Sequence, residues 1–328
     1  MSYKSFLLIL VILLLNQEAY SLYSNKTLLC CDEHSDPSSL SCFFKNNQPH
    51  QLQSNQRYLT GSVIGGLGNQ LFIMFTTISY AIKYDLPFIF EYTRVVADRR
   101  THWKGMYASL ICFSTKRYPR WHGFIKSLSY YNEKEFYYTE IPSPTQLTLN
   151  NKFTNGLKLN GYYQSYKYFN EYKHIIFQAI NIYHLQGQIY ERNYNKYFNT
   201  TKHVVAMHFR IGDYTLPRMT KVYPIMPLQY YINTIQQVIT DLDTPNVSTA
   251  TSPTTTTNTT TTTTAIRILC VYDPKDNNRI ENDYLVPLRL KFPGIEFIVV
   301  DSAMPDWHQM LLMSICRIII IANSTFSW

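Results

Sequence analysis

Hydrophobic and polar residues alternate along this chain in a pattern that predicts helices and strands in regular succession. A short apolar segment at 62–64 runs into a glycine-rich turn. Residues 71–82 then place apolar side chains at every third or fourth position, as an amphipathic helix does. Residues 87–90 begin with a proline and are otherwise apolar, which predicts a strand. Strand, turn, helix and strand form a βαβ unit, so we expect a parallel sheet.

A second series of the same kind opens near residue 203. Residues 95–160 carry scattered Tyr, Trp and Pro without a clear period, and no element is predicted there. The fold class predicted is therefore α/β, with an N-terminal half at 58–200 and a C-terminal half at 201–328. In the C-terminal half the pattern predicts strands at 204–207, 266–272, 296–300 and 318–322, and helices at 228–242, 282–292 and 307–316.

The first 21 residues are typical of a targeting segment. Ten apolar residues, Phe6 to Leu15, follow Lys4, and small residues stand at Ala19 and Ser21. This arrangement predicts a secretory signal that is either cleaved or retained as an anchor. As a helix, ten residues span about 15 Å, less than the hydrocarbon core of about 30 Å, which favours cleavage. Either way, the rest of the chain is expected in the lumen of the secretory pathway, in the Golgi membrane or secreted.

Two further segments lack the apolar period of a packed domain. Residues 22–57 are rich in Ser, Asn and Gln and contain Cys30, Cys31 and Cys42, which predicts a cross-linked stem. Residues 245–264 form a Thr-rich insert, which we expect to be a flexible and O-glycosylated loop. About 250 residues remain to pack, enough for one large or two medium domains. Cys316 lies in an apolar run and is predicted to be a buried free thiol.

Composition narrows the function classes. The chain is 45% hydrophobic and 16% charged, which excludes disorder over most of its length. Its net charge of +8 suggests an anionic partner. The basic residues form no stripe, so nucleic-acid binding is not expected. No Cys or His spacing suggests zinc. Asp241 and Asp243 form an Asp-x-Asp string of the kind that can hold magnesium or manganese, but they stand beside the insert at a predicted helix end, so we discount them as a metal site and expect no metal.

The glycine-rich turn is the first candidate site. Gly66 and Gly68 allow close backbone approach, and Asn69 and Gln70 begin the predicted helix, whose free N–H groups face outward. These groups could meet a phosphate or a sugar hydroxyl. Leu71 stands where a dinucleotide fingerprint requires a third glycine. A tight turn without a ligand is the alternative.

The segment at 208–214 is the second candidate site. It reads His-Phe-Arg-Ile-Gly-Asp-Tyr and directly follows a buried strand, at a carboxyl end where open α/β sheets bind ligands. Arg210 can clamp a diphosphate there. His208 and Asp213 are candidate bases at the same place. An Asp213–Arg210 surface ion pair and a structural histidine are the alternatives.

The last apolar run ends in a third group of polar residues. Asn323, Ser324, Thr325 and Ser327 follow the final predicted strand and present an amide and short hydroxyls at the sheet edge. Such groups can bind phosphate oxygens or the edge of a base. A helix N-cap at Ser324 or Thr325 is compatible with that role.

Four segments in this order resemble the motif series of the α-1,2-fucosyltransferase family. They are the glycine turn at 65–70, Gly-Tyr-Tyr-Gln-Ser at 161–165 with Tyr168 and Phe169, the segment at 208–214, and the segment from 312 to 328. The resemblance implies a GT-B fold, in which two Rossmann-like domains face each other across a cleft. It also implies inverting, metal-independent transfer from GDP-fucose, held by the C-terminal domain, to the 2-hydroxyl of a galactose-terminated glycan.

The same resemblance assigns roles to single residues. Arg210 matches the arginine that acts on the diphosphate, where it would stabilise the negative charge that develops on the leaving group. Ser324, Thr325 and Ser327 match a segment that contacts the donor, and Asn69 matches a position near the reacting sugar.

Two features depart from the family pattern. Ile211 stands where the family usually carries a second arginine, and the chain ends at Trp328, where a closing helix is expected, so we expect a truncated C-terminal domain. Two alternatives stay open, of which the first is supported by these departures and by the Thr-rich insert. One is a catalytically impaired, secreted carbohydrate-binding relative, and the other is a fucosyltransferase for another acceptor, such as a protein hydroxyl.

Overall fold

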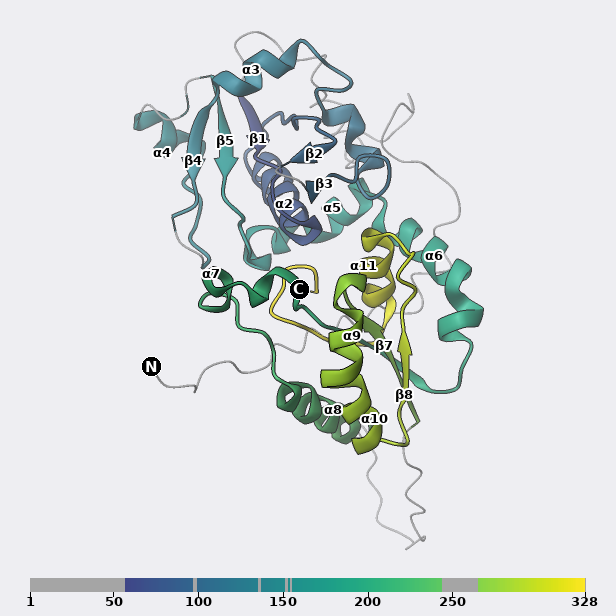
Figure 1. Cartoon of the computed structure of the whole chain (residues 1–328). Coiled ribbons are helices and arrows are strands. Elements are labelled where there is room, and N and C mark those ends of the chain that lie inside the picture. The colour runs from purple at the N-terminus through teal and green to yellow at the C-terminus, as the bar shows by residue number, and fades with distance from the viewer. Residues whose placement is uncertain are drawn as a thin grey trace, which may run out of the picture. The chain divides into compact units, whose positions relative to one another are not determined.

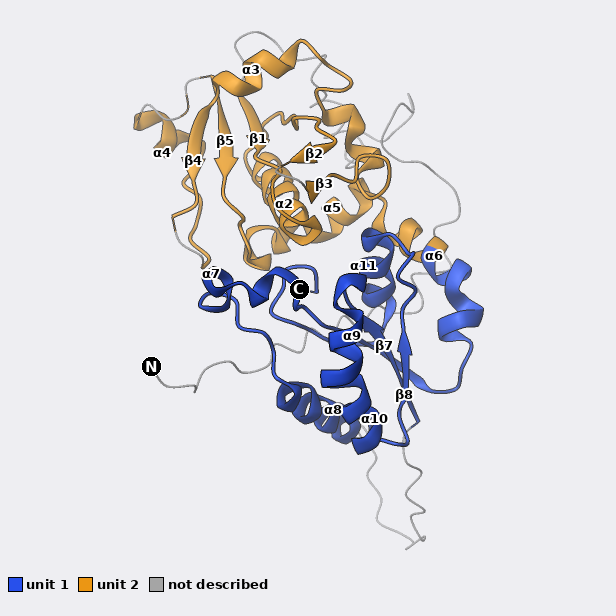
Figure 2. Cartoon of the chain, in the orientation of Figure 1, with its two compact units in different colours: residues 1–16, 189–327 blue, residues 17–188, 328 orange. Residues whose placement is uncertain are grey.

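The computed structural model describes residues 57–96, 99–134, 137–150, 153, 155–243 and 265–327. The predicted signal, nearly all of the predicted stem and the Thr-rich insert lie outside these residues. The described chain divides into two compact units, 57–188 and 189–327 (Figure 2). The division falls within α6 (Ile182–Asn193), earlier than the expected boundary at 200.

No helix in the described ranges is both long enough and apolar enough to span a bilayer.

The unit at 57–188 is built on a parallel sheet, as the βαβ pattern predicts. Its strands β1 (Tyr58–Gly61), β5 (Gly156–Asn160) and β4 (Ser129–Asn132) pair in the order β1-β5-β4, in parallel (Figure 1). The helix α2 (Leu67–Lys83) follows β1 and buries most of its side chains. It packs so closely on β1 that a Cβ at Gly61 would lie 2.4 Å from Oγ1 of Thr77.

Two predicted strands of this unit need correction. The first strand is Tyr58–Gly61 and not 62–64, because β5 pairs with those residues and the ladder ends near Ser62, whose N–H donates to the Leu159 carbonyl. Residues 87–90 are not a regular strand. They still bond β1 on one side, at Leu59, and residues 113–115 on the other, so they extend the parallel sheet beyond β1.

Shorter elements complete this unit. They are β2 (Val95–Val96), β3 (Arg99–Arg100), η3 (Ala108–Phe113), α3 (Trp121–Ser127), α4 (Pro144–Leu149), η4 (Tyr166–Tyr168), η5 (Asn170–Tyr172), α5 (Lys173–Ala179) and the first part of α6.

The unit at 189–327 contains a four-stranded parallel sheet in the order β8-β7-β6-β9. The α/β class and the parallel sheets that the sequence predicts are thus confirmed in both units. The strands are β6 (His203–His208), β7 (Ile266–Val271), β8 (Glu296–Val299) and β9 (Ile318–Ile320). The other elements are η6 (Tyr194–Phe198), η7 (Gly212–Thr215), α7 (Pro217–Thr220), α8 (Leu228–Asp243), η8 (Pro274–Asp276), α9 (Asn277–Ile280), η9 (Glu281–Leu285), α10 (Val286–Lys291) and α11 (Asp306–Ile315).

The strands and two of the helices of this unit agree with the prediction to within a few residues. The helix expected at 282–292 differs, because it begins at Asn277 and contains a π-helical turn, η9, between α9 and α10. Pro287 follows that turn. Proline lacks an N–H to donate to the preceding turn, which accounts for the break in the α-helical pattern there.

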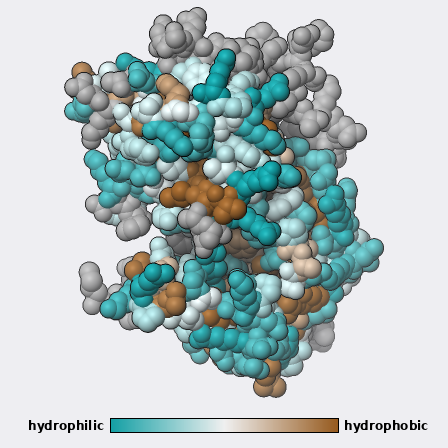
Figure 3. All heavy atoms as spheres, turned by 45° about the horizontal axis from the view of Figure 1, so that its top comes forward, coloured by the Kyte–Doolittle hydropathy of each residue, from teal (hydrophilic) through white to brown (hydrophobic). Residues whose placement is uncertain are grey.

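The core of this unit lies between the sheet and helices α8 to α10. The strands contribute four fully buried residues to this core: Val205, Met207, Ile268 and Cys270. The free thiol of Cys316 is also buried, as predicted, and burial raises its pKa to about 12. On the surface, hydrophobic residues occur in separate patches among hydrophilic ones on the face drawn in Figure 3.

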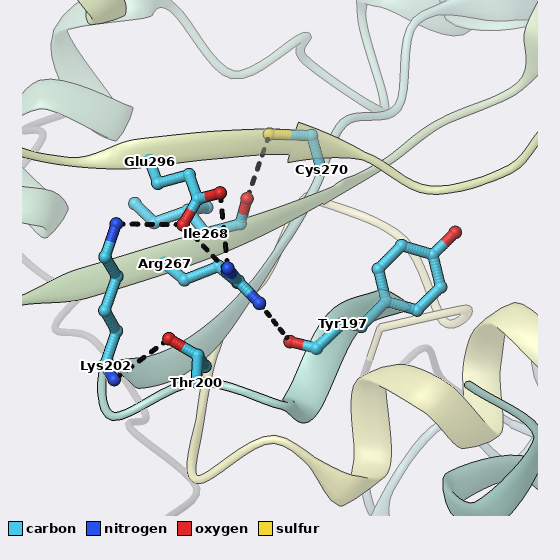
Figure 4. A network of polar contacts seen from close by, with 7 residues as sticks. All are labelled: Tyr197, Thr200, Lys202, Arg267, Ile268, Cys270 and Glu296. Carbon is cyan, nitrogen blue, oxygen red and sulfur yellow. Dashed lines mark hydrogen bonds and ion pairs between the residues drawn. The ribbon is translucent and has the colours of Figure 1, made fainter. Parts of the chain in front are cut away.

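A polar network fixes the amino ends of three strands of this sheet. Glu296 accepts hydrogen bonds from Arg267 Nε and Lys202 Nζ, each at 2.9 Å (Figure 4). Arg267 also donates to the Tyr197 carbonyl at 3.0 Å. The bonds from Arg267, and then from Lys202, hold the pKa of Glu296 below its ordinary value.

Candidate functional site

The order of the strands at 189–327 marks one place in the sheet as a binding site. From β6 the chain adds β7 and then β8 on one side, and it returns to add β9 on the other side of β6. Open parallel sheets bind ligands beyond the carboxyl ends of the strands at such a reversal. The loops that follow β6 and β9 meet at this point, and they are the two segments that the sequence singles out in this half.

The loop after β6 holds Arg210 in place. Its Nη2 donates to Oδ1 of Asp213 at 2.5 Å, and its guanidinium carbon lies 5.0 Å from the centre of the Tyr214 ring. Gly212 has φ = +36°, and its N–H donates to Oδ2 of Asp276 at 2.8 Å. The loop is thus fixed at both the side chain and the backbone, so the arginine is preorganised at the strand end.

Two buried nitrogen atoms at this strand end lack partners. Nε of Arg210 and Nδ1 of His208 are buried, and no described residue forms a hydrogen bond with either. Buried polar atoms are normally paired, so each such atom needs an explanation, and a ligand is one. Each is a potential hydrogen-bond donor, His208 when the neutral imidazole carries its proton on Nδ1.

The environment of His208 makes it a poor base. The residue is 5% exposed, and its ring lies 5.1 Å from the ring of Phe326. Burial, and then the charge of Arg210, lowers the pKa of His208 to about 3. A neutral imidazole with so low a pKa binds a proton weakly, which disfavours His208 as a general base. Asp213 is engaged by Arg210.

The segment after β9 divides into two kinds of residue. Ser327 is buried, and its hydroxyl bonds the backbone of Ala322 and Ser324, which closes the loop on itself. Ser324 accepts from the Phe326 N–H at 3.3 Å. Asn323, Ser324 and Thr325 are half-buried. Ser327 thus shapes the loop, while Asn323, Ser324 and Thr325 keep part of their surface exposed at this strand end.

Ile211 occupies the hydrophobic core. It is 2% exposed and belongs to the same buried cluster as Phe209 and Tyr231. The position at which the family usually carries a second arginine therefore faces apolar side chains in this chain. Arg210 alone supplies the cationic charge that the segment at 208–214 brings to the strand end.

A cavity of about 590 Å³ lies at the same edge of this sheet. Tyr272, Pro274 and Asn277 line it after β7, and Val300 and Asp301 line it after β8. The bond from Gly212 to Asp276 ties the arginine loop to the turn that carries Pro274. The volume suits a nucleotide-sized ligand. The sequence did not single out these lining residues, because they stand in segments with no motif.

The unit at 57–188 has a reversal of its own. From β1 the sheet continues through 87–90 on one side; on the other side the chain first forms the edge strand β4 and then β5, which lies between β4 and β1. The loops after β1 and β5 are the glycine turn and the segment at 161–165. They meet directly, because Gln164 donates to Oδ1 of Asn69 at 2.8 Å. Gly65 has φ = +77°, and a Cβ there would lie 2.7 Å from Asn69 and 3.2 Å from Tyr162.

The four predicted residues of the glycine turn play different parts. Gly66 is the N-cap residue of α2 and contributes only its backbone there, and Gly68 is buried in the first turn of the helix. Gln70 is fully buried, and its amide donates to the carbonyls of Gly65 and Arg100. Gln70 therefore shapes the turn. Asn69 is half-buried and accepts a hydrogen bond from Gln164.

The part of the chain that the structure describes contains no group of three or more His, Cys, Asp or Glu residues placed to hold a metal ion. Asp241 accepts a hydrogen bond from Gln237 at 2.7 Å on the exposed side of α8.

No protein-family model and no curated protein matches this sequence. Among solved structures, the chain is similar to a variant of FUT1 from Arabidopsis thaliana in complex with GDP, at 14% identity and a TM-score of 0.43, over 88% of this chain and 72% of that one. It is also similar to POFUT1 in complex with GDP, at 11% identity and a TM-score of 0.45, over 84% and 93%. The fucosyltransferase NodZ from Bradyrhizobium matches at 12% and 0.39, over 83% and 90%. At these TM-scores the likeness is remote.

Proposed function

We propose that the chain is a fucosyltransferase that transfers L-fucose from GDP-fucose to the 2-hydroxyl of a terminal galactose on a glycan. One observation carries the proposal: Nε of Arg210 and Nδ1 of His208 are buried, without a partner among the described residues, at the reversal of a parallel sheet. An anionic ligand there would satisfy both.

The nucleotide fits the rest of this unit. We place the diphosphate at Arg210 and the half-buried segment Asn323 to Thr325, and the nucleoside in the cavity beside Tyr272 and Asp301. The tyrosine ring could stack on a base, and the carboxylate could accept its N–H groups. The four-motif resemblance identifies the sugar, because a diphosphate site alone does not distinguish GDP-fucose from other nucleotide sugars.

The proposed reaction is an inverting transfer in which the charge of Arg210 stabilises the leaving group. The acceptor oxygen attacks the anomeric carbon of fucose from the face opposite GDP, so the configuration inverts. The bond from that carbon to the β-phosphate oxygen breaks, and its electron pair leaves with GDP. The preorganised Arg210 stabilises the negative charge that develops on the phosphate. The proposed mechanism needs no metal ion.

We also propose that the enzyme works in the secretory lumen, either anchored in the Golgi membrane or secreted. The support is the signal-like segment at 1–21, with its single Lys4 and ten apolar residues.

The test uses the full chain expressed in a eukaryotic secretory host. GDP binding is measured by calorimetry, and transfer is measured with labelled GDP-fucose and a galactose-terminated acceptor, with and without EDTA. A linkage-specific fucosidase then reads the product. We expect transfer that EDTA leaves unchanged and that an α-1,2-specific fucosidase reverses.

Each other result has a meaning. GDP binding with no transfer to any acceptor would favour the impaired carbohydrate-binding relative, a reading consistent with the loss of a second cation at Ile211. Transfer to a protein hydroxyl, or a product that resists the fucosidase, would move the proposal to another acceptor. Loss of transfer in EDTA would overturn the metal-free mechanism.

A further inference from the structure

Glu133 places a carboxylate at the reversal of the sheet at 57–188. It directly follows β4, and its N–H donates to the carbonyl of Asn160, the last residue of β5, at 2.8 Å. Its Oε2 accepts from the N–H groups of Tyr162 at 2.7 Å and Tyr163 at 3.0 Å. A Cβ at Gly161 would lie 2.3 Å from the Cβ of Glu133, so the close approach requires glycine.

The carboxylate therefore shares an edge with the glycine turn. Tyr162, which donates to Glu133, also lies beside Gly65, and Gln164 of the same segment bonds Asn69. Glu133 thus lies at the same edge as Asn69, which the family resemblance puts near the reacting sugar.

The charge of Glu133 is not neutralised by a nearby cation. Among the described residues, no Lys, Arg or His forms an ion pair with it, and none donates a hydrogen bond to Oε1. Two other carboxylates of this unit are paired: Glu91 with Lys158 at 3.8 Å, and Glu140 with Lys83 at 3.6 Å. The half-buried Glu133 thus has one oxygen fixed by the backbone and one available to bind a proton.

We propose that Glu133 is the general base of the reaction, an inference that rests on the proposed function. Its Oε1 takes the proton from the acceptor hydroxyl, while the hydroxyl oxygen forms a bond to the anomeric carbon. The bond from that carbon to GDP breaks, and its electron pair leaves on the β-phosphate. The proton ends on Glu133 and then passes to water.

Neither base candidate in the other unit competes well. The pKa of His208 is about 3, mainly because of burial, and Asp213 is engaged by Arg210 at 2.5 Å. General-base assistance contributes roughly 10²- to 10⁴-fold to a rate, so a base is worth assigning.

The decisive variant is Glu133→Gln. Its amide oxygen can still accept both backbone N–H groups, so the turn at 161–163 keeps its shape while the base is lost. We expect kcat to fall roughly 10²-fold or more, with the Kd for GDP and the melting temperature unchanged. The matched control is Glu140→Gln, which removes an exposed carboxylate of the same unit and should leave kcat unchanged.

The pH profile gives a second readout that does not depend on a variant. In the part of the chain that the structure describes, the phenols of Tyr131 and Tyr163 interact with Glu133, and burial raises the pKa of both, so neither titrates in acid. The wild type should lose kcat on the acidic side as one carboxylate becomes protonated, and Glu133→Gln should lack that limb.

The outcomes separate the two proposals. If the wild type transfers fucose and Glu133→Gln keeps its kcat within a few-fold, Glu133 is only a clamp on the backbone and the inference fails alone. The same holds if the wild-type profile is flat in acid. If the wild type binds GDP and transfers nothing, the proposed function and this inference fail together. If the variant unfolds, the wild-type profile decides.

Discussion

The two units use the same architectural position for opposite chemistry. In each, a parallel sheet reverses its strand order, and the loops after the two strands at the reversal meet. At 189–327 these loops present Arg210 with an unpartnered buried nitrogen beside His208. At 57–188 they present an amide pair, Asn69 with Gln164, beside the carboxylate Glu133. A cation with donors suits an anion, and a carboxylate with amides suits a neutral hydroxyl compound, so one fold position can serve either substrate of a transfer reaction.

The largest effect should come from removing the cation. We expect Arg210→Ala to lower kcat by roughly 10²- to 10³-fold, because preorganised charge at the leaving group is lost. Arg210→Lys should recover little, since an ammonium lacks the planar fork of donors. The assay is fucose transfer, with thermal unfolding to confirm the fold. The exposed Arg218→Ala is the control, and equal loss in both variants would show a general charge effect instead.

The second prediction tests whether the strand end that carries Arg210 could hold a second cation at position 211. Ile211→Arg should lower the free energy of unfolding by about 3 kcal/mol or more, because the side chain enters an apolar cluster without a partner. Urea denaturation measures the loss. Ile211→Leu, similar in volume, should cost less than about 1.5 kcal/mol. A stable Ile211→Arg variant with tighter GDP binding would mean that position 211 faces the ligand.

A smaller effect is expected at the edge of the sheet at 57–188 that carries Asn69 and Gln164. Gln164→Ala removes the bond to Asn69 and should raise the acceptor KM about 5-fold, the value of one ordinary hydrogen bond near 1 kcal/mol. The Kd for GDP should not change. The exposed Gln178→Ala serves as the control. A change in GDP binding would contradict the separate roles of the two edges.

The smallest effect is expected at the amino edge of the sheet at 189–327, where Glu296, Arg267 and Lys202 stabilise the fold. The pKa of Glu296 is held below its ordinary value, so its contribution is present above that value and is lost as pH falls through the lowered one. Glu296→Gln should therefore cost less than about 1 kcal/mol at neutral pH, and the difference from wild type should vanish in acid. Denaturation at several pH values measures this, with the exposed Glu191→Gln as control. A cost that grows in acid would contradict the assignment.

Sequence pattern was a good guide where the period is local. It predicted α2, α8, α11 and four strands of the second sheet, because 3.6- and 2-residue periods depend only on neighbouring residues. It misplaced the first strand, since the register of Tyr58–Gly61 is set by β5, nearly a hundred residues away. It also predicted one helix at 282–292, where Pro287 interrupts the pattern.

The site shows the same limit. Arg210 and the glycine turn carry recognisable motifs, and the structure places each at a strand reversal. Glu133 carries none, because its partners Tyr162 and Tyr163 lie across the sheet and only folding brings them together. The burial of Ser327 and Gln70 also depends on distant packing, so sequence alone could not separate residues that shape a loop from residues left for a ligand.

The place where the Thr-rich segment joins the described chain has a consequence for protein engineering. The described chain stops at the end of α8 and resumes just before β7, so both attachment points lie at the amino edge of the sheet, away from Arg210. An insertion at this junction therefore enters at the edge of the sheet opposite the strand end that carries Arg210. The same junction offers a place to insert an affinity tag or a fluorescent reporter without redesigning the catalytic edge.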